Sequence, residues 1–102
     1  MDEEKKSIKQ KDFIEMELFM IWAVNEALKY LKKNPKKEIH DAISYFVDGA
    51  RHILAKEELK LSAIGAVNAA MRYKELHPSA KDKEIFQHVL DKSAEIIYSL
   101  FD

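Results

Sequence analysis

The sequence repeats itself at a fixed offset of 43 residues, and this repeat limits the folds open to the chain. Residues 23–35 read AVNEALKYLKKNP and residues 66–78 read AVNAAMRYKELHP, with six identical positions in thirteen. The identities include an Asn, a Tyr and a Pro, none of which is a common helix-filling residue. The same register pairs Asp48 with Asp91 without a gap. We therefore expect two tandem helical hairpins that stack on each other.

The composition narrows the fold class to all-α. Apolar residues make up 47% and charged residues 34% of the chain, whereas Gly and Pro number two each. This balance is too apolar for a disordered chain and too poor in turn-forming residues for a many-stranded β protein. We expect an antiparallel four-helix bundle as one domain at residues 12–102, with hairpins at about 12–57 and 58–102, after a flexible charged lead-in at 1–11.

Charge and residue usage exclude several functional classes. The net charge of −1 argues against bulk attraction to nucleic acid or membranes, and the absence of Cys excludes disulfides and thiolate-bound metals. The first residues are charged where a signal peptide would be apolar, and the longest apolar run, residues 18–24, is too short for a membrane span. We expect a soluble cytoplasmic protein, whose Lys- and Glu-rich charge is typical of heat-adapted organisms.

Helical periodicity predicts four amphipathic helices. The first covers about residues 13–33, with capping-box spacing between Asp12 and Glu15. Asn34 before Pro35 predicts a turn and the N-cap of the second helix, and His77, Pro78 and Ser79 repeat this break. The predicted buried stripes are Ile14, Leu18, Ile21, Asn25 and Leu28; Ile39, Ala42, Ile43, Phe46, Val47, Ala50, Ile53 and Leu54; Leu61, Ile64, Val67 and Met71; and Ile85, Phe86, Val89, Leu90, Ile96, Ile97 and Leu100.

The boundary between the second and third helices has no proline to mark it. One continuous helix would force each hairpin to pack against a second chain. We expect a turn within residues 55–62 instead, because a helix of about forty residues would be far above the average length in globular proteins.

The repeated residues suggest how the two hairpins meet. Asn25 and Asn68 lie on predicted apolar stripes, so we expect a structural hydrogen bond between them across an approximate two-fold axis. Small residues form a neighbouring stripe in both repeats, and they would let the first and third helices cross closely with the other two outside. These small residues are Ala23 and Ala27, matched by Ala66 and Ala70.

The repeats differ most where the first reads LFMIWAV and the second reads LSAIGAV. Phe19, Met20 and Trp22 belong to seven consecutive apolar residues that surround the whole helix, which a helix with one solvent face should not carry. Two interpretations remain open. Either Trp22 fills the space left at Gly65, or these three residues bind a protein partner or a second copy of the chain.

Lysines cluster near both predicted hairpin turns. In an up-down-up-down bundle the two turns share one pole, so these cations form a candidate anion-binding site or stabilise the helix C-termini there. We call the set the basic pole: Lys32, Lys33, Lys36, Lys37, Arg72 and Lys74.

The sequence offers little support for catalysis, and we expect no cofactor and no metal. His40, His52, His77 and His88 do not form a ligand set with metal-site spacing. Residues 72–77, RYKELH, are similar in their arginine-to-histidine spacing to the HEPN-type RNases, which are also small helical bundles. Tyr73 stands where that family usually places a polar residue.

Three functions follow from these patterns. We expect a non-enzymatic interaction module that binds a protein partner or itself through the apolar residues of the first helix. A nucleic-acid-associated protein that uses the basic pole is the alternative. The resemblance of residues 72–77 implies a third function, an RNase.

Overall fold

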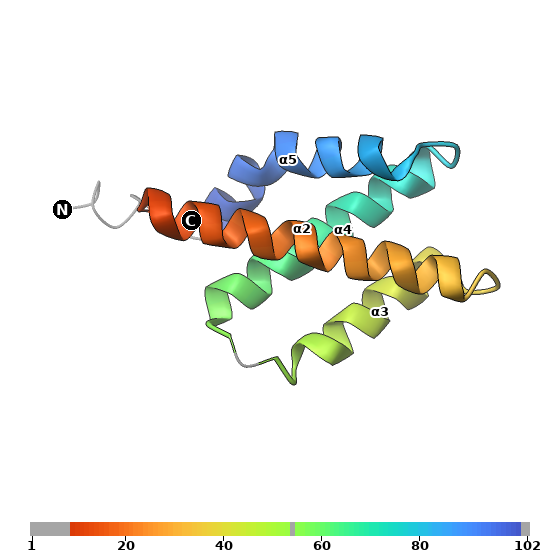
Figure 1. Cartoon of the computed structure of the whole chain (residues 1–102), viewed down its shortest axis with the longest axis horizontal. Helices are drawn as coiled ribbons and strands as arrows, with labels where there is room; N and C mark the ends of the chain where they lie inside the picture. The colour runs from red at the N-terminus through yellow and green to blue at the C-terminus, as the bar shows by residue number, and fades with distance from the viewer. Residues whose placement is uncertain (1–8, 54, 101–102) are drawn as a thin grey trace.

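The chain folds as an all-α bundle. The computed structural model describes residues 9–53 and 55–100, which form four helices and no strand. In chain order the helices are α2 (Gln10–Lys33), α3 (Ile39–Ala50), α4 (Glu57–Leu76) and α5 (Asp82–Ser99). They run alternately up and down, so the α2–α3 and α4–α5 turns lie at the same end of the molecule, as predicted (Figure 1).

Helices α2 and α4 form the centre of the bundle. They share the most extensive contact of any helix pair, while α3 and α5 lie on opposite sides of them (Figure 1). Ala23, Ala27, Ala66 and Ala70 are fully buried at this centre. Small side chains let the two helix backbones approach closely, so the predicted pairing of the first and third helices is confirmed.

Buried positions recur at the repeat offset. In the central helices, Val24 and Leu28 match Val67 and Met71, and all four are at most 3% exposed. In the outer helices, Ala42 matches Ile85 in the same way. This correspondence supports the interpretation of the chain as two tandem hairpins.

The helix boundaries differ from the predicted ones at three places. Helix α2 begins at Gln10 with Lys9 as its N-cap, so Gln10 and Lys11 are helical rather than part of the lead-in, and Asp12 is not a cap. No Pro or Gly precedes the predicted start in this segment, so the helix extends further toward the N-terminus than predicted. The rest of the lead-in, residues 1–8, lies outside the described part of the chain.

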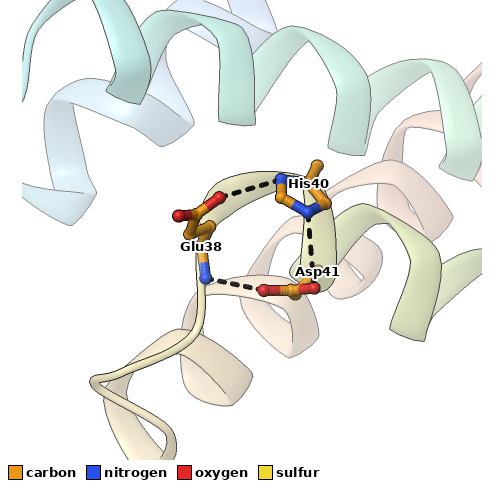
Figure 2. A network of polar contacts seen from close by, with 3 residues as sticks. All are labelled: Glu38, His40 and Asp41. Carbon is orange, nitrogen blue, oxygen red and sulfur yellow. Dashed lines mark hydrogen bonds and ion pairs between the residues drawn. The ribbon is translucent and has the colours of Figure 1, made fainter.

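The predicted N-cap of the second helix is also wrong. Asn34 caps the C-terminus of α2, where its backbone N–H donates to the carbonyl oxygen of Tyr30 at 3.0 Å. Helix α3 starts after Glu38, whose backbone N–H donates to Asp41 Oδ2 at 2.8 Å in a capping box (Figure 2). The carboxylates of Glu38 and Asp41 therefore accept the hydrogen bonds at the start of α3 that Asn34 was predicted to accept.

Helices α3 and α4 are separate, as expected, but their connection lies earlier than predicted, at residues 51–56. Ile53 of the predicted stripe is thus in the connection, and Leu54 is outside the described residues. Gly49 near the end of α3 weakens the helix because glycine has a low helix propensity. Reverse-turn hydrogen bonds follow, from the His52 N–H to the Gly49 oxygen and from the Ile53 N–H to the Ala50 oxygen.

The predicted pairing of the asparagines is wrong. Asn68 is exposed and Asn25 is partly buried, and no hydrogen bond joins them. The alanines of α2 and α4 lie between these two helices instead. The two Asn side chains therefore remain in contact with water and avoid the free-energy cost of burying an unpaired amide.

Helices α5 and α2 are joined by a partly buried hydrogen bond between Ser93 and Glu17, in addition to the exposed Lys32–Asp82 ion pair. The Ser93 hydroxyl donates to Glu17 Oε2 at 2.6 Å, and Ser93 is buried. Every buried side-chain nitrogen and oxygen of the described residues has a partner. None of the described helices combines the length and the apolar character that a membrane span requires.

Candidate protein-interaction surface

The outer face of α2 carries large apolar side chains that the core does not use. Ile14, Leu18 and Trp22 follow one another at helical i, i+4 spacing and are 48%, 67% and 41% exposed. Ile14 and Leu18 were predicted to be buried. They are exposed because the small and flexible side chains on the opposite side of α2, including Met16 and Met20, make the contact with the other helices.

Trp22 stands at the edge of an aromatic cluster between α2 and α3. Its ring centroid lies 5.2 Å from that of Phe19 and 5.8 Å from that of Phe46, the latter in an edge-to-face arrangement. Such aromatic pairs hold their rings in defined orientations. The indole is therefore fixed at the surface rather than free to fold away.

Two hollows flank this cluster. The first has a volume of about 460 Å³ and is mainly apolar, with Glu26 and Asp48 among its lining residues beside Trp22, Phe46 and Ile53. The second has a volume of about 730 Å³, and its lining residues are Glu15, Phe19, Ile53, Ala55, Lys56, Leu59 and Lys60. Because Ile53 lines both hollows, they adjoin each other.

We call the combined area the Trp22 surface: Ile14, Leu18, Phe19, Trp22, Phe46 and Ile53. A concave apolar area with a few polar groups at its edge is the usual form of a binding site. Exposed apolar patches of this kind also mark protein interfaces.

The structure contradicts one of the two interpretations of Trp22. A Cβ atom added at Gly65 would lie 2.8 Å from Ile96 Cγ2, so Ile96 of α5 occupies the space beside Gly65. Trp22 lies against Phe19 and Phe46 instead. The indole therefore does not fill the gap at Gly65.

Of the three predicted partner-binding residues, the structure brings two to the surface. Phe19 is half-buried and Trp22 is exposed, but Met20 is 1% exposed and belongs to the core. Met20 lies on the side of α2 that faces α4, about 160° around the helix from Trp22. Sequence reasoning missed Ile14 and Leu18 as surface residues, although an apolar run around the whole helix already indicated a second apolar face.

The basic pole is interrupted by carboxylates. Lys32 forms an ion pair with Asp82 across the two hairpins, while Lys33, Lys36, Lys37 and Arg72 are exposed and Lys74 is half-buried. Glu38 and Asp41 lie next to the first turn, 3.3 and 3.6 Å from the two nitrogens of the His40 ring (Figure 2). The cations are thus mixed with acidic groups rather than gathered in one patch.

His77 and His88 pack on a tyrosine instead of on one another, and His52 is exposed. The Tyr73 ring lies 4.5 Å from the His77 ring and 4.4 Å from the His88 ring, measured between centroids. Arg72 and His77, the residues similar to the RNase pattern, are both exposed near the end of α4. Within the part of the chain that the structure describes, no group of three metal-ligating side chains converges.

Comparisons with protein-family models, with curated proteins and with solved structures each found no match to this chain.

Proposed function

We propose that this chain is a non-enzymatic interaction module that binds a protein partner, or a second copy of itself, through the Trp22 surface. The observation that carries the proposal is the row of three large apolar side chains on the outer face of α2, above all Leu18, which is 67% exposed. Contact with a partner would remove this area from water, at a gain of about 25 cal/mol per Å² of apolar surface.

The second hairpin supports this assignment by contrast. At the repeat offset, the positions of Ile14, Leu18 and Trp22 are occupied by Glu57, Leu61 and Gly65. The outer face of α4 therefore has one large apolar side chain where α2 has three. A bundle that needed these side chains for folding would need them on both central helices, since the core positions correspond.

The experiment replaces Leu18 with a photo-crosslinking amino acid and irradiates the cells that produce the protein. A chain with the same replacement at Leu61 is the matched control. Both residues are exposed leucines at equivalent places of the repeat. We expect covalent adducts from position 18 and none from position 61. Adducts with the mass of two chains identify self-association, and other masses identify a different partner. Equal adduct formation at the two positions, or none at either, would contradict the proposal.

The nucleic-acid alternative has its own test, because Lys33, Lys36 and Lys37 are exposed at the end of α2 and in the α2–α3 turn. Phosphate contacts weaken steeply as salt increases, whereas an apolar interface does not. A gel shift that disappears with added salt and is abolished by exchange of Lys33, Lys36 and Lys37 for Glu would favour this function. Absence of binding at low salt would exclude it.

A further inference from the structure

The Trp22 surface contains both a protruding part and a hollow part. Ile14 and Leu18 project from α2, and one turn further along the helix Trp22 borders the hollow that Phe46 and Ile53 also line. An interface between two identical chains related by a two-fold axis uses the same patch on each copy, so that patch must complement itself. The projecting Ile14 and Leu18 lie beside an apolar hollow that can receive the same side chains of a second copy, so the patch meets this requirement.

The charges around the surface are also complementary to one another. Lys11 is exposed one turn before Ile14, at the ridge end of the surface. Glu26 and Asp48 line the hollow at the other end; Glu26 pairs with Lys29 at 4.0 Å, whereas Asp48 has no ion-pair partner among the described residues. A second copy placed antiparallel along α2 would bring Lys11 of one chain to Asp48 of the other.

From these two observations we infer that the Trp22 surface binds a second copy of this chain through an antiparallel pair of α2 helices; the inference rests on the proposed function. Leu18 lies near the two-fold axis, where it meets Leu18 of the other copy. Ile14 of each chain contacts the hollow beside Trp22 of the other, and Lys11 faces Asp48. A parallel pair would instead place Lys11 beside Lys11 and Asp48 beside Asp48.

The size of the surface suits a dimer. Helix α2 has 24 residues. An antiparallel pair with Leu18 on the axis overlaps residues 10–26 of each α2, about 25 Å at a rise of 1.5 Å per residue, and a strip about two helix diameters wide then covers roughly 500–600 Å². Roughly 1,000–1,200 Å² for both partners is at the small end of protein interfaces, which fits a reversible dimer.

The first test is sedimentation equilibrium of the full chain over a wide concentration range. We expect a reversible change from the 11.9 kDa monomer to twice that mass. Leu18→Glu places a charge on the axis and should raise the dissociation constant at least about tenfold, whereas Leu61→Glu on α4 should leave it unchanged. Circular dichroism of both variants checks that they remain helical.

The second test exchanges charges to establish the antiparallel arrangement. Lys11→Glu and Asp48→Lys should each raise the dissociation constant several-fold, and the chain that carries both changes should recover most of the affinity. No recovery would overturn the antiparallel arrangement.

A chain that stays monomeric at every concentration, or a dimer that Leu18→Glu leaves intact, would overturn the inference. If the monomer still forms adducts with another protein at position 18, only the identity of the partner is wrong and the interaction module stands. If position 18 forms no adduct either, both are wrong.

Discussion

The hairpins α2–α3 and α4–α5 make the same contacts next to their turns. The Tyr30 ring stacks on Tyr45 with centroids 4.2 Å apart and planes at 20°, and at the repeat offset the Tyr73 ring stacks on His88 at 4.4 Å and 22°. The turns match as well. The Lys37 N–H donates to the Asn34 oxygen, and the equivalent Ala80 N–H donates to the His77 oxygen, both at 2.9 Å.

Away from the turns the hairpins differ, and the difference centres on one pair of equivalent positions. Gly65 has no side chain, so Ile96 of α5 packs directly against α4. Trp22 stands at the equivalent place on α2, and Ile53, the equivalent of Ile96, lies beyond the end of α3. Helix α3 has 12 residues whereas α5 has 18. The second hairpin is therefore closed where the first has a hollow.

This difference teaches that corresponding residues build the core of both hairpins, whereas Ile14, Phe19 and Trp22, whose equivalents are Glu57, Ser62 and Gly65, set the Trp22 surface apart. The buried alanines and the stacked rings recur because each hairpin must cover the other. In the first hairpin α3 ends at Ala50, and Trp22 lies beside the hollow past its end, partly exposed.

The largest effects should come from the equivalent core positions Leu28 and Met71, which are 3% and 0% exposed. Replacing either with Ala removes buried apolar contacts and leaves a cavity, so each should lower the free energy of unfolding by about 2–5 kcal/mol. Urea denaturation measures both values. A loss below about 1 kcal/mol for one of them would show that the two hairpins do not share one core.

A smaller effect should separate the hairpins at their point of difference. Gly65→Leu inserts a side chain where Ile96 Cγ2 already lies 2.8 Å from the Cβ position, and should cost about 1–3 kcal/mol of stability through overpacking. Trp22→Leu in the first hairpin should cost about 1 kcal/mol or less, since the indole is already 41% exposed. Thermal unfolding measures both losses of stability. Equal losses for Gly65→Leu and Trp22→Leu would contradict the closer packing of the second hairpin at this position.

The stacked pairs should contribute equally in the two hairpins. Double-mutant cycles with Ala at Tyr30 and Tyr45, and at Tyr73 and His88, should each give a coupling energy of about 0.5–1.5 kcal/mol. The equivalent geometry predicts that the two energies agree within about 0.5 kcal/mol. A coupling in one hairpin alone would mean that the rings match in position but not in energetic role.

The smallest expected effect is a stabilisation. A Cβ atom added at Gly49 in α3 meets nothing within 4 Å, so Gly49→Ala adds helix propensity without a clash. It should raise the free energy of unfolding by about 0.5–1 kcal/mol. Gly65→Ala is the matched control, and its gain should be smaller because of the nearby Ile96. A larger gain at Gly65 would contradict the close packing of α4 and α5.

The repeat predicted the arrangement of the helices well, because small residues at corresponding positions allow only a close crossing of α2 and α4. The choice of the buried face on α2 was harder. Residues 18–24 are all apolar, so two different stripes fit the helical period equally well. Which of them is buried depends on the packing of α4 against Ala23 and Ala27, and that is a tertiary effect.

The candidate site was predicted in part for the same reason. Phe19 and Trp22 were identified from the place where the repeats diverge, and both line the hollows. Phe46 and Ile53 were predicted only as core residues, because the end of α3 has no proline to mark it. The hollow lies past the end of α3 at Ala50, where Gly49 is the one local signal and was not used in the prediction.

The central claim is that the first hairpin, and not the second, carries the interaction surface. The most direct measurement is a series of amide NMR spectra of the full chain from dilute to concentrated solution. Signals of residues 11–26 and 45–53, and of Lys56, Leu59 and Lys60 beside the second hollow, should move with concentration, while those of residues 61–69 and 88–96 stay in place. Movement of residues 61–69 and 88–96, or no movement in any helix, would contradict the claim for self-association through the Trp22 surface.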